Sequence, residues 1–298
     1  MWIKRIFLLT LISLVLLVIN AAEKNVIIGV LEDIPGKFAG EKNTRAVRVV
    51  FEKNGGEWRA FPSDCSDVKC LELSVTEYPS EGDWTIAFNG QALGRVTSRA
   101  EKVAYYCDIG LQNIVSTGSI PTIGTRSDEF ATWASNSLYR PLIAVSQPNV
   151  NDPEHWKPTQ VSSALIIQLH RQFRQKYSTL CTFDKDENKK AFNYRDDDIT
   201  LGKAYESNKD WILAELHLKD AVTCNAEFPL VGIDCWFIVD PRRKIRALDV
   251  EGRLVDAGDY DNDGTSELVF QTDGYNRNGY VMFYDDFKKN ISFEFSYH

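Results

Sequence analysis

The chain has 298 residues, of which 34 are basic and 42 are acidic, so its net charge is −8 at neutral pH. This negative balance argues against nucleic acid and anionic membranes as partners, because both attract basic surfaces. A chain of this length can bury a large core, either as one large β domain or as two smaller ones.

The N-terminus has the pattern of an export signal, which we assign to residues 1–22. Lys4 and Arg5 precede an apolar run from Ile6 to Ile19, and Ala21-Ala22 offers a cleavage site of small residues. The run is shorter than the roughly 20 residues of a membrane span, and an uncleaved anchor is the alternative. Because the segment holds two cations and no acids, cleavage would leave residues 23–298 with a net charge of −10. We therefore expect a secreted or periplasmic protein without stable membrane insertion.

Six cysteines belong to the mature chain: Cys65, Cys70, Cys107, Cys181, Cys224 and Cys235. An even number in an exported protein favours disulfide bonds over metal ligation. Sequence alone leaves many pairings open. Short separations along the chain favour Cys65 with Cys70 and Cys224 with Cys235.

The first half of the mature chain is predicted to form β hairpins. Asn54-Gly55-Gly56 and Asn89-Gly90 are turn sequences, because Asn and Gly accept the positive φ that tight hairpins require. The strands predicted around these turns and after them are 26–31, 47–51, 57–61, 84–88, 93–97, 107–115 and 142–145.

One α-helix is predicted after Pro158. Thr159 or Ser162 can cap its N-terminus, and we expect it to pack on the side of a β domain. Residues 184–190 are polar and charged, which indicates an exposed loop. The apolar positions of the helix recur about every four residues: Val161, Leu165, Leu169 and Phe173, with Ile166 beside them.

The strand pattern returns in the second half. The turns 207–210 and 240–243 separate strands of alternating polarity, and Pro241 occupies a position that a type I turn accepts. Tyr280–Tyr284 is apolar on both faces, as a central strand should be. The predicted strands are 199–205, 211–218, 235–239, 244–248, 280–284 and 291–297.

The stretch from Asp259 to Glu267 carries carboxylates at positions one, three, five and nine, with Gly264 at position six. Alternate residues of a tight loop point inward, so we expect its four carboxylates to converge. Hard oxygen donors in this arrangement suit Ca²⁺, with the Thr265 carbonyl as a further ligand and water completing the shell. Without a cation the carboxylates would repel one another.

This stretch differs from an EF-hand. Phe270 stands where an EF-hand has its bidentate Glu, and apolar strand sequences flank the loop instead of helices. An ordinary Asn-Asp-Gly hairpin turn that happens to be acidic is the alternative.

Residues 259–267 and the strand that follows resemble the calcium motif of FG-GAP/VCBS-type repeats, which form the blades of β-propellers. The resemblance covers the C-terminal part of the chain and implies a calcium-loop blade over 253–298. One copy of the motif is evident. The layout of the chain also resembles that of secreted bacterial proteins that end in one such motif. The ligands that the resemblance implies are Asp259, Asp261, Asp263, Thr265 and Glu267.

Repeated hairpins with one helical insertion predict a single mainly β domain over 23–298. Propeller blades take about 40–45 residues each, which leaves room for about five or six blades. A β-sandwich or two β subdomains are the alternatives.

Other chemistry is sparse in the sequence. No zinc-protease motif, nucleophile elbow or phosphate-binding glycine loop is present among the 298 residues. Asp184, Asp186 and Asn188 repeat the spacing of an ion loop, but lysines follow where a glycine is needed. The histidines and the tryptophans are each explained by structural roles before catalytic or ligand-binding ones: His155, His170, His217 and His298, and Trp58, Trp84, Trp133, Trp156 and Trp211.

We therefore expect an exported, disulfide-bonded β protein with a structural Ca²⁺ site whose task is to bind a protein or carbohydrate ligand. A secreted hydrolase on the same calcium-stabilised scaffold is the alternative, and a component of a cell-surface assembly is a third possibility.

Overall fold

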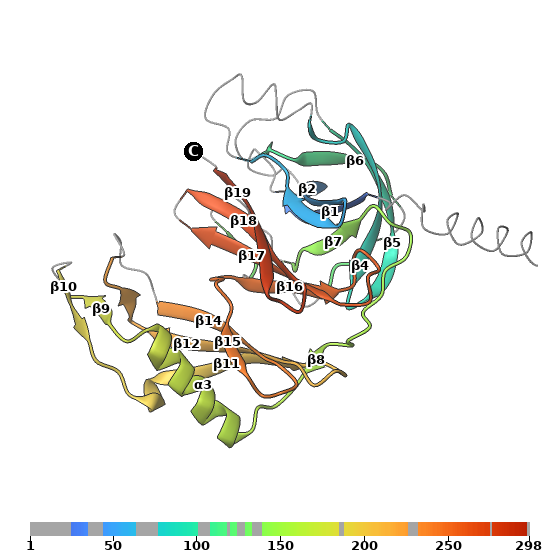
Figure 1. Ribbon diagram of the computed structural model, residues 1–298. Coiled ribbons are helices and arrows are strands. Elements are labelled where there is room, and N and C mark those ends of the chain that lie inside the picture. Colours follow the sequence, from blue (N-terminus) through green and yellow to red (C-terminus); the bar gives the residue numbers. More distant parts are fainter. Residues whose placement is uncertain are drawn as a thin grey trace, which may run out of the picture.

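The computed structural model describes residues 25–34, 44–63, 77–100, 108–117, 120–123, 129–132, 139–184, 188–225, 232–274 and 276–296 (Figure 1). Within these ranges the chain is mainly β, as predicted, with one α-helix. The expected export signal over 1–22 and the cysteines Cys65, Cys70 and Cys107 lie outside the described residues. None of the helices in the described ranges is long and apolar enough to cross a bilayer.

The N-terminal strands form a closed barrel. The sheet order is β1-β7-β4-β5-β6-β2-β3, and β1 also pairs with β2, so six strands close on themselves and β3 extends from β2. Phe51, Trp84 and Ile86 fill the interior and are fully buried. The strands are β1 (Val26–Ile34), β2 (Thr44–Asn54), β3 (Glu57–Ala60), β4 (Glu81–Phe88), β5 (Gln91–Ala100), β6 (Leu111–Thr117) and β7 (Leu142–Val145).

A five-stranded antiparallel sheet follows, with the helix α3 (Ser163–Lys176) against one of its faces. The hydroxyl oxygen of Ser162 accepts a hydrogen bond from the backbone N–H of Leu165, which confirms the predicted cap. Leu169 and Phe173 are fully buried against this sheet. The order is β15-β14-β12-β11-β8, with β8 (Lys157–Pro158), β11 (Ile199–Glu206), β12 (Ile212–Lys219), β14 (Gly232–Val239) and β15 (Ile245–Ala247).

A small sheet of order β10-β9-β13 carries the disulfide bond of the described chain. Cys181 is bonded to Cys224, so the predicted pair Cys224–Cys235 is wrong. The reason is the pairing of β9 with β13, which places the two bonded Cα atoms 4.9 Å apart, whereas Cys235 is a buried free thiol in the core beneath α3. The strands are β9 (Leu180–Phe183), β10 (Lys189–Phe192) and β13 (Val222–Thr223). The segment 184–190, predicted as a loop, therefore ends inside β10.

The C-terminal strands form an antiparallel meander that lies between the barrel and the five-stranded sheet. Along β17, Val269 joins the core shared with the barrel, while Leu268 and Phe270 join the core shared with the five-stranded sheet. Both faces are therefore buried, which explains the continuous apolar pattern of this region. The strands, in sheet order, are β16 (Arg253–Gly258), β17 (Glu267–Gly274), β18 (Arg277–Tyr284) and β19 (Lys289–Ser296).

The five or six propeller blades expected from the sequence do not appear among the described residues. One closed barrel and three open sheets are found instead. Hairpin spacing cannot separate these folds, because barrels, sandwiches and propellers all use short antiparallel strands joined by tight turns. The segment 253–298, expected to be the last blade, provides an interior sheet with a core on each face.

Candidate metal centre

The acidic loop joins β16 to β17, so its strand-loop-strand setting agrees with the sequence analysis. Asn262 and Gly264 have positive φ values of 61° and 91°, which turn the chain sharply. The carboxylate of Asp259 accepts hydrogen bonds from the backbone N–H groups of Asp263 and Gly264, each at 3.0 Å. The loop is therefore wrapped around the Asp259 side chain.

Three carboxylates converge inside the loop. One oxygen from each of Asp259, Asp261 and Glu267 lies within 4.8 Å of the other two. Asp259 and Glu267 are only 3% and 1% exposed. Charged groups this deeply buried need a partner of opposite charge.

The other two predicted ligands lie at the rim of the loop. The Asp263 side chain is 45% exposed. Thr265 donates two hydrogen bonds to it, one from the backbone N–H at 2.9 Å and one from the hydroxyl at 2.6 Å. The structure thus brings together three of the four predicted carboxylates and leaves the fourth facing solvent.

A lysine that sequence analysis missed reaches this cluster from the barrel. The Nζ of Lys53, at the end of β2, lies 2.6 Å from Asp261 and 3.6 Å from Asp263. Lys53 and Asp261 are separated by 208 residues, so no local pattern could have revealed the contact. One ammonium group balances one of the four carboxylates, and a net charge of −3 remains if all four are ionised.

The electrostatics of the site disfavour ionised carboxylates. Burial raises the pKa of Asp259 to about 6, and the nearby charges of Asp261 and Asp263 act in the same direction. Burial, together with the charge of Asp261, holds the pKa of Glu267 well above its usual range. Burial alone would lower the pKa of Lys53, but the hydrogen bond and the charge of Asp261 outweigh it and raise this pKa.

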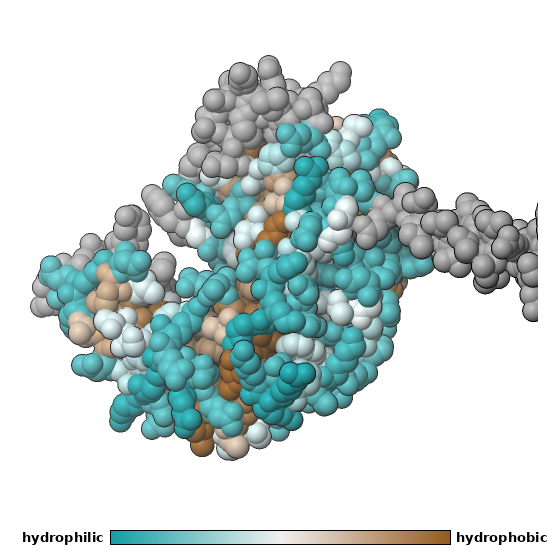
Figure 2. Space-filling view, viewed as in Figure 1, coloured by the Kyte–Doolittle hydropathy of each residue, from teal (hydrophilic) through white to brown (hydrophobic). Residues whose placement is uncertain are grey.

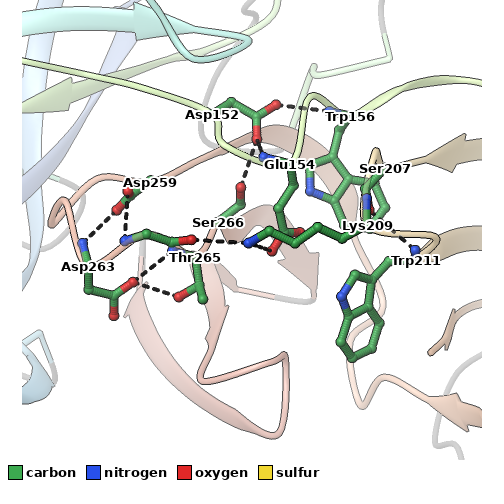
Figure 3. Close-up of polar contacts among 11 residues, drawn as sticks. Asp152, Glu154, Trp156, Ser207, Lys209, Trp211, Asp259, Asp263, Thr265 and Ser266 are labelled. Carbon is green, nitrogen blue, oxygen red and sulfur yellow. Dashed lines mark hydrogen bonds and ion pairs between the residues drawn. The ribbon is translucent and has the colours of Figure 1, made fainter. Parts of the chain in front are cut away.

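A second layer of hydrogen bonds fixes the loop from the segment that precedes β8 (Figure 3). The buried carboxylate of Asp152 accepts from the hydroxyl of Ser266 at 2.7 Å and from the backbone N–H of Trp156 at 2.9 Å. Lys209, on the turn between β11 and β12, donates to the carbonyl of Gly264 at 3.1 Å and lies 3.4 Å from Glu154. The loop therefore contacts the barrel through Lys53 and the five-stranded sheet through Lys209.

Asp256, on the strand β16 that leads into the acidic loop, connects this region to the barrel. Asp256 is fully buried and accepts hydrogen bonds from the backbone N–H of Asn89 at 3.0 Å and from the hydroxyl of Tyr260 at 3.1 Å. Burial raises the pKa of Asp256 to about 7. The β4–β5 turn of the barrel thus binds Asp256, which in turn binds Tyr260, the residue after Asp259.

The donor set fits a hard divalent cation. All candidate side-chain ligands are carboxylate oxygens, and the cluster includes no histidine or cysteine. Ca²⁺ and Mg²⁺ prefer oxygen donors, whereas Zn²⁺ favours nitrogen and sulfur. A divalent ion would reduce the residual charge of the cluster and relieve the repulsion among its buried carboxylates.

The other candidates from the sequence have structural surroundings. His217 lies on the five-stranded sheet, where its Nδ1 is 2.6 Å from Asp234 and its Nε2 is 3.4 Å from Glu215. The hydrogen bonds to Asp234 and Glu215 raise the pKa of His217 to about 10, so this histidine is a cation held between two acids. Trp58 and Trp84 are buried in the barrel core. Asp184 accepts from the backbone N–H of Asn188, while Asp186 lies outside the described residues.

Comparisons of the chain with protein-family models, with curated proteins and with solved structures found no match. The likeness to FG-GAP/VCBS-type repeats therefore rests on the sequence of the loop itself.

Proposed function

We propose that the chain is an exported Ca²⁺-binding protein whose ion is structural and whose β scaffold binds a protein or carbohydrate ligand. The observation that carries the metal site is the convergence of Asp259, Asp261 and Glu267 within 4.8 Å. In this proposal the loop is of the FG-GAP/VCBS type, with Asp263 and the Thr265 carbonyl as further ligands. Residues 1–22 direct export to the periplasm or the exterior.

The place of the loop supports a structural role for the ion. Side chains from the barrel and from the five-stranded sheet both contact it, through Lys53 and Lys209. An ion that orders the loop would therefore fix the barrel, the five-stranded sheet and the C-terminal sheet relative to one another. At a free Ca²⁺ concentration one hundred times Kd, binding to the folded state alone adds about 2.7 kcal/mol. This is a large part of a typical stability of about 5–15 kcal/mol.

Ca²⁺ suits the loop better than Mg²⁺. Ca²⁺ accepts irregular shells of about six to eight oxygens, including backbone carbonyls. Mg²⁺ requires near-octahedral geometry and keeps several of its waters. Three carboxylates cluster within 4.8 Å, and Asp263 lies at the exposed rim. This arrangement matches an open, irregular shell.

Thermal unfolding with and without a chelator tests this proposal. We expect the melting temperature to fall when Ca²⁺ is removed, and to recover with Ca²⁺ but not with Mg²⁺. Asp259→Asn should abolish the response. A matched control is Asp249→Asn, which removes an exposed acid paired with Lys176. Identical melting curves with and without chelator would refute the metal site.

A further inference from the structure

A pocket opens at the end of the interface between the five-stranded sheet and the β18–β19 turn, and its volume is about 110 Å³. Trp211 and Ile238 form its apolar wall, and Lys244, Arg246 and Lys288 supply cations. Figure 2 shows a mostly hydrophilic face that is interrupted by apolar side chains near the middle of the molecule, where these sheets meet. Layer interfaces of this kind commonly hold small ligands.

The charge around this pocket is opposite to that of the protein. Residues 240–246 and 285–289 together contain six basic side chains and three acidic ones, whereas the whole chain carries a net charge of −8. Two acids also line the pocket, but Asp240 accepts from the backbone N–H of Lys244 at 2.7 Å. Asp286 pairs with Lys288 at 2.8 Å. A local excess of positive charge on an acidic protein favours an anionic ligand.

Arg246 supplies a donor that the described residues do not satisfy. Its register opposite Ile238 turns it toward the C-terminal sheet, and one terminal nitrogen donates to the carbonyl of Asp286 at 3.2 Å. The Nε of Arg246 is buried and has no hydrogen-bond partner among the described residues. A buried N–H without an acceptor is unfavourable. Guanidinium groups bind carboxylate and sulfate oxygens through paired donors, so a shift of the Arg246 side chain toward the pocket would bring this donor to an anion.

The turn that borders the pocket has an unusual backbone. Asp285, Asp286 and Phe287 have consecutive positive φ values of 54°, 54° and 59°. Residues other than glycine rarely adopt this conformation, and then usually one at a time. The buried Phe287 ring holds it in place, with ring centroids 5.2 Å from Trp211 and 5.8 Å from Trp156. Strain retained in this way is commonly found at ligand sites.

We propose that this pocket binds an acidic saccharide, with the carboxylate or sulfate group of one sugar unit on Arg246 and Lys244 and the ring of that unit against Trp211. Tryptophan combines a large apolar body with low flexibility, which suits it to packing against a sugar ring. The pocket volume is about 110 Å³, so most of the saccharide would extend outside it. This proposal names the ligand class for the binding role proposed above, and it uses none of the Ca²⁺ ligands.

Isothermal titration at saturating Ca²⁺ tests the pocket with three probes of equal length: a galacturonate trisaccharide, a sulfated galactose trisaccharide and the neutral galactose trisaccharide. We expect one anionic probe to bind about tenfold or more tightly than the neutral one, and the preferred probe identifies the anionic group. Arg246→Gln and Lys244→Gln should each weaken binding by about tenfold. The control is Arg99→Gln on the barrel, where Arg99 pairs with Glu81 on the surface, and it should leave binding unchanged.

Several outcomes would overturn the proposal. These are equal binding of the neutral and anionic trisaccharides, binding unaffected by Arg246→Gln, or binding of an acidic peptide such as tri-glutamate in place of the saccharides. Far-UV circular dichroism and melting curves of each variant separate loss of binding from loss of fold. A Ca²⁺ titration in the same samples keeps the two proposals apart, because failure to bind saccharide with intact Ca²⁺ binding refutes only the pocket.

Discussion

Two connections at the same end of the C-terminal sheet border sites of opposite charge. Gly258 pairs with Glu267 and Leu268 pairs with Phe283, so the 259–266 loop and the 285–288 turn lie at the same end of the strands. The loop gathers buried acids and contacts Lys53 of the barrel. The turn faces the five-stranded sheet, where cations surround a pocket. The acidic loop therefore owes its charge to its own residues. The 285–288 turn carries two acids and one base, so the cations at the pocket come mainly from the five-stranded sheet packed against it.

One turn of the five-stranded sheet reaches both sites (Figure 3). Lys209 donates to the carbonyl of Gly264 in the acidic loop, and Trp211, two residues later, lines the cationic pocket. The hydroxyl of Ser207 accepts from the backbone N–H groups of both Lys209 and Trp211, each at 3.2 Å. The two sites are therefore held at a fixed separation by a single hydrogen-bonded turn.

Removing the aromatic anchor of the cationic side should have the largest effect. Phe287 is 2% exposed between Trp156 and Trp211. We expect Phe287→Ala to reduce the free energy of unfolding by about 3–5 kcal/mol, because it leaves a cavity in an aromatic cluster. Urea denaturation at saturating Ca²⁺ measures this, with Phe287→Leu as a milder control. A loss below about 1 kcal/mol would mean that the ring does not anchor the turn.

On the acidic side, Glu267→Gln should reduce Ca²⁺ affinity by about a hundredfold, because it removes a buried charged ligand. Without Ca²⁺, the same variant should be as stable as the parent protein or more so, since a buried carboxyl with a strongly raised pKa gains little from ionisation. Isothermal titration and chelated melts measure the two effects. Glu294→Gln on β19, where Glu294 is exposed, is the control. Unchanged Ca²⁺ affinity in Glu267→Gln would remove Glu267 from the ligand set.

The acidic side should also respond to pH. The pKa of Asp259 is raised from 3.8 to about 6, so its contribution to stability is present below pH 3.8 and is lost as pH rises through about 6. Bound Ca²⁺ offsets this loss but competes with the proton for the carboxylate. We expect Ca²⁺ affinity to be about tenfold weaker at pH 5 than at pH 7. Titrations in two buffers of different ionisation enthalpy count the released protons, and a flat profile would contradict the assignment of Asp259.

The smallest expected effect concerns the lysine that reaches the acidic loop. Lys53→Met should tighten Ca²⁺ binding by about fivefold, since a unit charge near 4 Å contributes about 1 kcal/mol even in water. The same change should lower the melting temperature of the chelated protein, because an ion pair to Asp261 is lost. Lys53→Arg keeps the charge and should leave both quantities near their parent values. Weaker Ca²⁺ binding in Lys53→Met would mean that the ammonium group supports the ion.

The sequence predicted the features that depend on neighbouring residues. The Asn54-Gly55-Gly56 and Asn89-Gly90 turns join the predicted strands, the helix begins after Ser162, and the acidic loop gathers three of its four carboxylates. Each of these follows from turn geometry, capping or alternation within about ten residues. Local rules therefore account for these turns, for the start of the helix and for the negative charge of the candidate metal centre.

The features that the sequence did not predict depend on distant contacts. Barrel closure requires β1 to pair with both β2 and β7, and β7 begins more than one hundred residues after β1. The Cys181–Cys224 bond spans 43 residues, and Lys53 meets Asp261 across 208. Hydrophobic periodicity and turn sequences do not indicate which distant strands lie next to each other. The expected propeller was wrong for this reason, although the strands themselves were found.

The most direct test is a crystal structure of the Ca²⁺-saturated protein with anomalous scattering from the ion. We expect an ion bound by oxygens of Asp259, Asp261 and Glu267 at about 2.3–2.6 Å, with the Lys53 Nζ displaced from its position 2.6 Å from Asp261. A structure at saturating Ca²⁺ that shows no ion, with Lys53 still bonded to Asp261, would contradict it. The ammonium group would then be the cation on which these buried carboxylates depend.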